Sequence, residues 1–83
     1  MGVFYKDWAL RDISAEMAKQ GYFEKAIETA QKISKKYGES EALKDISIEI
    51  AQQGSYDEAF ETTMKIYEEF HKSQALIRIS VLM

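Results

Sequence analysis

The chain has 83 residues, the length of one small domain, with 46% hydrophobic and 30% charged residues. This composition is typical of a soluble globular protein and excludes a disordered chain. The absence of cysteine excludes disulfides, thiolate metal sites and cysteine nucleophiles. A net charge of -3 gives no electrostatic attraction to nucleic acid or to an anionic membrane. Because no targeting signal or long apolar run is found, we expect a reducing, cytoplasmic compartment.

The chain repeats itself. A segment that begins at Ala9 recurs 33 residues later, from Ala42, and 15 of the 33 aligned residue pairs are identical without a gap. A third copy begins at Ala75 and is partial. The predicted organisation is a single domain, 1–83, with repeats at about 9–41 and 42–74 and a partial repeat at 75–83.

Five helices are predicted in chain order, two in each repeat and one in the partial repeat. Apolar residues recur at three- and four-residue steps in each half of a repeat, which is the period of a helix. We expect Gly21 to end the first helix and Gly54 the third, because glycine suits the left-handed cap conformation. The second helix is expected to continue through Ile33 and Tyr37 and to end at Gly38.

Serines mark the predicted helix starts. Ser40 and Ser73 are the expected N-caps of the third and fifth helices, and Ser55 with Glu58 fits a capping box at the fourth. His71 then falls near the end of the fourth helix, where the helix dipole favours a cation. The basic stretch 32–36 falls in the last turn of the second helix.

Groups with chemical reactivity are few. His71 is the only histidine in the sequence, and no second imidazole or thiolate completes a metal site around it. Ser14 and Ser47 recur without a histidine partner, which argues against a nucleophile. The four glycines are isolated, so no phosphate-binding loop is formed. We therefore expect no catalytic residue, no cofactor and no bound metal, and a chain that is not an enzyme.

The segments 21–27 and 54–60 share one spacing. Each has a glycine, an aromatic residue two positions later, an acid three positions later and an alanine five positions later. This pattern resembles the loop and second-helix start of tetratricopeptide repeats (TPRs), and the resemblance covers nearly the whole chain. The chain departs from that family at Ser14 and Ser47, where the family has a glycine, and in a period one residue shorter than usual.

The TPR resemblance implies an all-α fold: a right-handed α-solenoid of antiparallel helix pairs whose first helices line a concave groove. It also implies a protein-protein interaction scaffold that binds a peptide or helix of a partner protein. The implied groove residues are Trp8, Arg11, Ala15, Lys44, Ile48 and Gln52.

Several groove positions allow a second interpretation. Ala15 and Ile48 stand where chaperone-tail binders carry asparagine, so we expect an amphipathic segment as ligand and not a chaperone tail. Arg11 and Lys44 could meet a carboxylate of the ligand. Alternatively, Trp8 caps the first helix pair, and Arg11 and Lys44 are solvated.

The fifth predicted helix is apolar on more than one side, which suggests another function. Its expected self-association residues are Ile77, Val81, Leu82 and Met83. An exposed apolar strip of this kind marks an interface or a truncated or engineered array. We expect a two-fold homodimer through this helix if the chain is not such a fragment.

The pentatricopeptide family, whose members read RNA, is the nearest alternative to the TPR family. Its base-reading position normally carries a small polar residue, and here that position holds Arg11 and Lys44. The sequence therefore predicts no nucleic-acid partner, and it predicts no membrane partner either.

Overall fold

The structure, a computed structural model, describes the backbone of residues 2–83 and the side chains of residues 6–83. Residues 2–83 form five helices and no strand, which confirms the predicted all-helical fold. The helices are α1 (Gly2–Lys19), α2 (Phe23–Ala30), α3 (Lys36–Gln52), α4 (Tyr56–Thr63) and α5 (Glu69–Leu82). Within this range no helix has the length and apolar character that a bilayer crossing requires.

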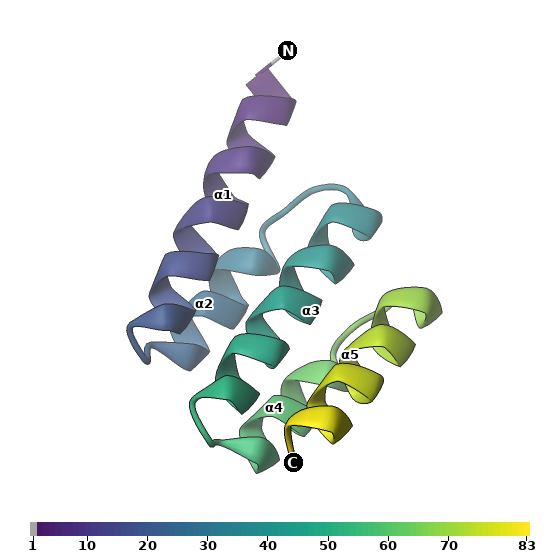
Figure 1. Ribbon diagram of the computed structural model, residues 1–83. Coiled ribbons are helices and arrows are strands. Elements are labelled where there is room, and N and C mark those ends of the chain that lie inside the picture. Colours follow the sequence, from purple (N-terminus) through teal and green to yellow (C-terminus); the bar gives the residue numbers. More distant parts are fainter. Residues whose placement is uncertain (1) are drawn as a thin grey trace.

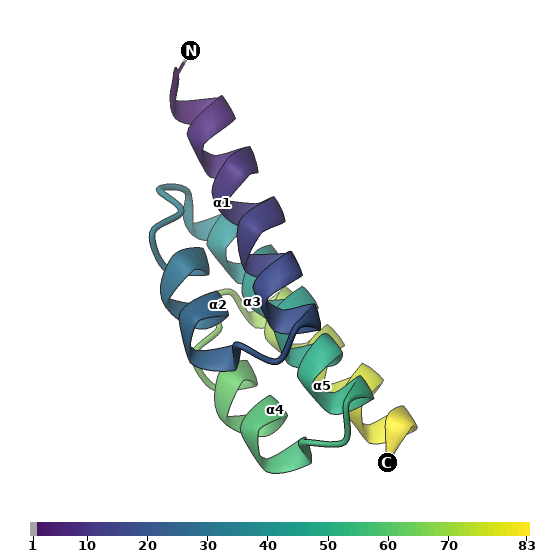
Figure 2. The same ribbon diagram turned by 90° about the vertical axis from the view of Figure 1, so that its left-hand side faces the viewer.

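The helices lie in two layers. Figure 1 shows α1, α3 and α5 side by side in one layer, with α2 and α4 in a second layer behind them. The perpendicular view in Figure 2 shows the same two layers from the side. Helix α3 packs against all four other helices, so it lies at the centre of the molecule.

Two glycines make the turns between the helices of each pair. Gly21 has φ 90° and Gly54 has φ 91°, a region that other residues enter only with strain. The backbone N–H of Gly21 donates to the carbonyl of Ala18 at 3.0 Å, and that of Gly54 donates to the carbonyl of Ala51 at 2.9 Å. The predicted left-handed caps are thus confirmed at both positions.

Helix α2 is shorter than predicted. It ends at Ala30, so the expectation that it continues to Gly38 was wrong. The N–H of Ile33 donates to the carbonyl of Ala30 at 3.0 Å in a tight turn, and this turn directs the Ile33 side chain into the core, where it is 5% exposed. Lys35 is extended and α3 begins at Lys36, which places Gly38 inside α3.

The predicted N-caps of the third and fifth helices were also wrong. Ser40 lies inside α3 and Ser73 inside α5, because both helices begin earlier in the chain. The cap of α5 is Glu68, whose carboxylate accepts hydrogen bonds from the N–H groups of Phe70 and His71. Ser40 is buried, and its hydroxyl accepts a hydrogen bond from the N–H of Glu68 at 3.2 Å.

Two smaller expectations also need correction. Ser55 occupies the N-cap position of α4, as predicted, but its side chain makes no capping hydrogen bond. The basic stretch 32–36 lies in the connection between α2 and α3 and in the first residue of α3, and not in the last turn of α2.

Small residues allow the two layers to approach. Ala26 on α2 and Ala59 on α4 are equivalent in the repeat, and both are fully buried. Leu43, Ile46 and Ile50 of the central helix fill the space between the layers and are at most 1% exposed. All buried side-chain nitrogen and oxygen atoms among residues 6–83 have a hydrogen-bond partner.

Each first helix after α1 is buried against the pair before it. Ile46 of α3 is 1% exposed and Ile79 of α5 is 0% exposed, whereas the equivalent Ile13 of α1 is 47% exposed. A side-chain bond crosses the same junction, because Nε2 of Gln53 donates to the carbonyl of Ala18 at 2.8 Å. The junctions between pairs therefore contribute much of the core.

We predict that the same substitution has unequal effects at equivalent positions. Ile46→Ala should lower the free energy of unfolding by about 2–5 kcal/mol, because it leaves a cavity in the core. Ile13→Ala should lower it by only about 1 kcal/mol, because much of that side chain is already in solvent. Chemical denaturation measures both values, and equal losses would contradict the junction described here.

Candidate functional site

The predicted groove residues divide between two places. Trp8, Arg11 and Ala15 of α1 line a hollow of about 440 Å³ between α1 and α3. Lys44 of α3 instead contacts α5, where its Nζ donates to Oε1 of Gln74 at 3.5 Å. The remaining residues that line the hollow are Asp12, Ser14, Ala42 and Asp45.

The other two predicted groove residues differ in accessibility. Ile48 is only 8% exposed, so it is part of the packed face of α3 and offers little apolar surface to a ligand. Gln52 is exposed in the last turn of α3. The structure thus brings three of the six predicted residues to one hollow and leaves the other three outside it.

Trp8 does not act as a cap of the first helix pair. Its side chain is 73% exposed, which contradicts that interpretation. Arg11, Asp12 and Ala15 line the same hollow as Trp8, so this indole is available at its margin. Indole rings at such partly apolar, partly polar positions are frequent in binding surfaces.

Arg11 is held by two acids of the chain. Its Nη1 lies 3.0 Å from Oε1 of Glu41, and its Nη2 lies 3.2 Å from Oδ2 of Asp45. Partial burial lowers the pKa of Arg11, but the hydrogen bond to Asp45 and the charges of Glu41 and Asp45 outweigh burial and raise it overall. The guanidinium is therefore charged and already paired, so the alternative that Arg11 is merely solvated is wrong.

The two junctions between first helices use the same register. The contact of Arg11 with Glu41 recurs 33 residues later as the contact of Lys44 with Gln74. The residue three positions after each basic residue is a serine. The hydroxyl of Ser14 donates to the backbone carbonyl of Arg11 at 2.9 Å, and the hydroxyl of Ser47 donates to that of Lys44 at 2.8 Å. These serine hydroxyls are thus engaged within their own helices.

Sequence reasoning did not pair Arg11 with its two acidic partners. Glu41 and Asp45 lie far from Arg11 along the chain, and only the packing of α3 on α1 brings them together. A signal was present, because opposite charges occupy positions that face each other when the helix pairs are stacked. The contact of Asp7 with Ser34, in which Oδ2 accepts from the Ser34 hydroxyl at 2.8 Å, was missed in the same way.

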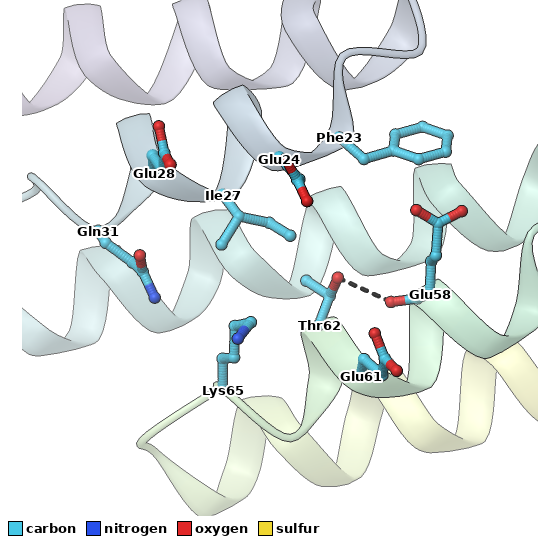
Figure 3. Close-up of a pocket in the computed structure, with 9 residues that line it drawn as sticks. All are labelled: Phe23, Glu24, Ile27, Glu28, Gln31, Glu58, Glu61, Thr62 and Lys65. Atoms are coloured by element: carbon cyan, nitrogen blue, oxygen red, sulfur yellow. Dashed lines mark hydrogen bonds between the residues drawn. The ribbon is translucent and has the colours of Figure 1, made fainter.

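A second hollow, of about 400 Å³, lies between α2 and α4 (Figure 3). It was not predicted, although the recurrence of Glu28 at Glu61 was a visible signal. The residues that line it are Phe23, Glu24, Ile27, Glu28, Gln31, Glu58, Glu61, Thr62 and Lys65. Figure 3 shows Ile27 and Thr62 near its centre, with glutamates around them.

Among residues 6–83 no three histidine or acidic side chains are grouped in a way that could hold a metal ion.

His71 lies in the first turn of α5 and not near a helix C-terminus. The physical reason is the Glu68 cap, which starts α5 at Glu69. His71 is 2% exposed. Its ring makes a T-shaped contact with the ring of Tyr37, with the two centroids 4.6 Å apart. Its Nδ1 lies 2.5 Å from Oε1 of Glu68. His71 is thus a packed residue that connects the cap of α5 to α3.

The predicted self-association residues are exposed at the C-terminal end. Ile77 is 63%, Val81 80%, Leu82 39% and Met83 70% exposed. The hydroxyl of Tyr56 donates to the carbonyl of Leu82 at 3.1 Å, which ties the end of α5 to α4. The outer side of α5 is therefore an apolar surface on an anchored helix.

Comparisons with family models, curated proteins and solved structures found no match.

We predict a pH-dependent contribution of the Glu68 cap. The backbone N–H of His71, which donates to the carboxylate, is the main cause that lowers the pKa of Glu68 below its ordinary value of 4.5. A lowered pKa means that the cap stabilises the fold above pH 4.5 and that this stabilisation is lost as the pH falls through the lowered value. Glu68→Gln should therefore melt below the wild type near neutral pH, with a gap that narrows in acid.

The neighbouring Glu69 offers a matched control for this cap. Its side chain is 84% exposed and makes only a 3.8 Å contact with Lys72. Glu69→Gln should change the melting temperature little at any pH. A gap for Glu68→Gln that stays constant into strong acid, or an equal gap for Glu69→Gln, would contradict the role assigned to the carboxylate.

Proposed function

We propose that this chain is a non-enzymatic, TPR-like scaffold, a right-handed α-solenoid that binds a segment of a partner protein on its layer of first helices. The observation that carries the proposal is the hollow between α1 and α3, which has the exposed indole of Trp8 at its margin. The recurrence of the same contacts at 33-residue spacing supports the repeat architecture. We place the protein in the cytoplasm, as its sequence predicts.

The charges in the hollow favour one kind of ligand. Arg11 is paired with Glu41 and Asp45, and Asp12 adds another exposed carboxylate to the lining. The lining therefore carries more negative than positive charge. A basic side chain of the ligand could meet these acids and the face of Trp8 together, since cations are attracted to indole rings. An amphipathic helix with a lysine or arginine beside its apolar face fits these requirements.

The proposal assigns no catalytic role to the chain. The hydroxyls of Ser14 and Ser47 donate to carbonyls of their own helices. The imidazole of His71 is buried and occupied by Glu68. These side chains have structural partners that account for their positions, and the sequence repeat accounts for the recurrence of the two serines.

A self-assembly module is the second candidate function. The observation that favours it is the exposure of Ile77 and Val81 on a helix whose end is fixed to α4 by Tyr56. The hollow is lined by α1 and α3, whereas these exposed apolar side chains belong to α5.

We predict that peptides selected from a display library for binding to this chain carry a basic residue and shift the fluorescence of Trp8. Trp8 is the only tryptophan in the sequence, so the emission reports on the surroundings of this one indole. Asp12→Lys should weaken such a peptide about tenfold, because it reverses one charge at the hollow.

Asp57→Lys is the matched control for this experiment. It makes the same change of net charge at an exposed position on α4, away from the hollow. Titrations of both variants with the same peptide separate a local contact from the overall field of the protein. Equal weakening by both variants, or binding without a change in Trp8 emission, would contradict the proposed site.

A further inference from the structure

The junctions between first helices follow one rule. At the junction of α1 with α3, Arg11 reaches Glu41 at 3.0 Å, and at the junction of α3 with α5, Lys44 reaches Gln74 at 3.5 Å. Each contact joins a residue of one helix to the residue 30 positions later on the next. The pairing of a cation with an acceptor is therefore a property of the junction register.

The same register leaves one pair of positions without partners in a single chain. Ile77 of α5 is equivalent to Arg11 and Lys44, and Trp8 of α1 is equivalent to Glu41 and Gln74. Both are large and apolar, and they are 63% and 73% exposed. The residue types thus change from polar to apolar together, at the two positions that would meet if α1 of another copy followed α5.

The face of α1 that would take part has the chemistry of a buried junction. Ala42 and Ala75, on α3 and α5, are at most 2% exposed, whereas the equivalent Ala9 is exposed. Ile13 is likewise 47% exposed, whereas its equivalents Ile46 and Ile79 are at most 1% exposed. Helix α1 therefore presents to solvent a surface that α3 and α5 bury against the preceding helix pair.

The opposite face of α5 shows the corresponding difference. Helix α5 lies beside α3 in this layer (Figure 1). Ile48 of α3 is 8% exposed, whereas the equivalent Val81 of α5 is 80% exposed. We name Ile77 and Val81 the α5 edge, and Trp8, Ala9 and Ile13 the α1 edge. The two edges correspond by sequence equivalence to the two helix surfaces that meet at each junction inside the chain.

We propose that copies of this chain associate head to tail, with the α5 edge of one copy packed against the α1 edge of the next in the register of the internal junctions. The occupant of the α5 edge is thus a second copy, and the contact is heterologous, unlike the two-fold contact of α5 with α5 that the sequence suggested. Such a contact leaves one free edge at each end, so association continues beyond a dimer. Stacking of this kind would also extend the layer of first helices.

The contact should be weak. Inside the chain, α3 packs on α2 as well as on α1, but α1 of a second copy would meet only α5. A small interface of this kind corresponds to a dissociation constant on the order of 100 µM. Association should therefore be visible at high concentration and reversible on dilution.

Cysteine trapping tests the register directly, because the chain has no cysteine of its own. Trp8→Cys and Ile77→Cys are mixed in equal amounts at about 0.5 mM in a glutathione redox buffer, and the disulfide products are separated by intact mass. The proposal predicts the mixed product in excess of the statistical half. Excess of the Ile77→Cys homodimer would overturn it in favour of the two-fold contact, and a statistical mixture would overturn it outright.

Glu28→Cys provides the control for random collision, since Glu28 is exposed on α2, in the other layer, and lines the hollow between α2 and α4. Mixed with Ile77→Cys, it should give no more than the statistical amount of mixed disulfide. A yield equal to that of the Trp8→Cys pair would show that the trapping is unspecific and would overturn the proposal.

A second experiment needs no cross-link. Ile13→Glu blocks the α1 edge and Ile77→Glu blocks the α5 edge, and both positions are exposed enough to keep the fold, which circular dichroism verifies. In sedimentation velocity each variant alone should remain monomeric, whereas their mixture should form a one-to-one dimer and stop there. Oligomers formed by Ile13→Glu alone, or a mixture of the two variants that stays monomeric, would overturn the head-to-tail arrangement.

Discussion

The fold depends on the burial of each first helix against the helix pair that precedes it. Ile46 and Ile79 are almost fully buried at these junctions, whereas the equivalent Ile13 of α1 is about half exposed. The buried core draws residues from all five helices, including Ala26 of α2 and Ala59 of α4. Because the core draws on both helix pairs and on α5, stability is shared between neighbouring elements. The same constraint leaves apolar side chains of α1 and α5 exposed.

The sequence predicted what the repeat itself encodes. Because the 33-residue repeat has no gap, equivalent positions in the two units should have the same local conformation and burial. The left-handed turns at Gly21 and Gly54 and the full burial of Ala26 and Ala59 follow from this equivalence. Helix number and helix type were predictable for the same reason, since each half of a unit carries one apolar stripe.

The repeat does not determine where within a unit each helix starts. Ser40 has a good N-cap propensity, but the chain turns at Ile33, whose side chain is buried, and α3 already begins at Lys36. In the second unit the cap is a glutamate, Glu68, which a search for serine overlooks. The site shows a similar limit, because Arg11 was identified but its acidic partners depend on how α3 packs on α1. Packing between distant segments decides both outcomes.

Native-state amide hydrogen exchange tests the central claim of shared burial most directly. Helix α3 packs against every other helix, so its amides should exchange only through the global unfolding reaction. The amides of α1 and α5, each with a neighbour on one side of the layer, should exchange faster through local opening. Protection in α1 and α5 equal to that in α3, or fast exchange in α3, would contradict a core built from junctions between stacked helix pairs.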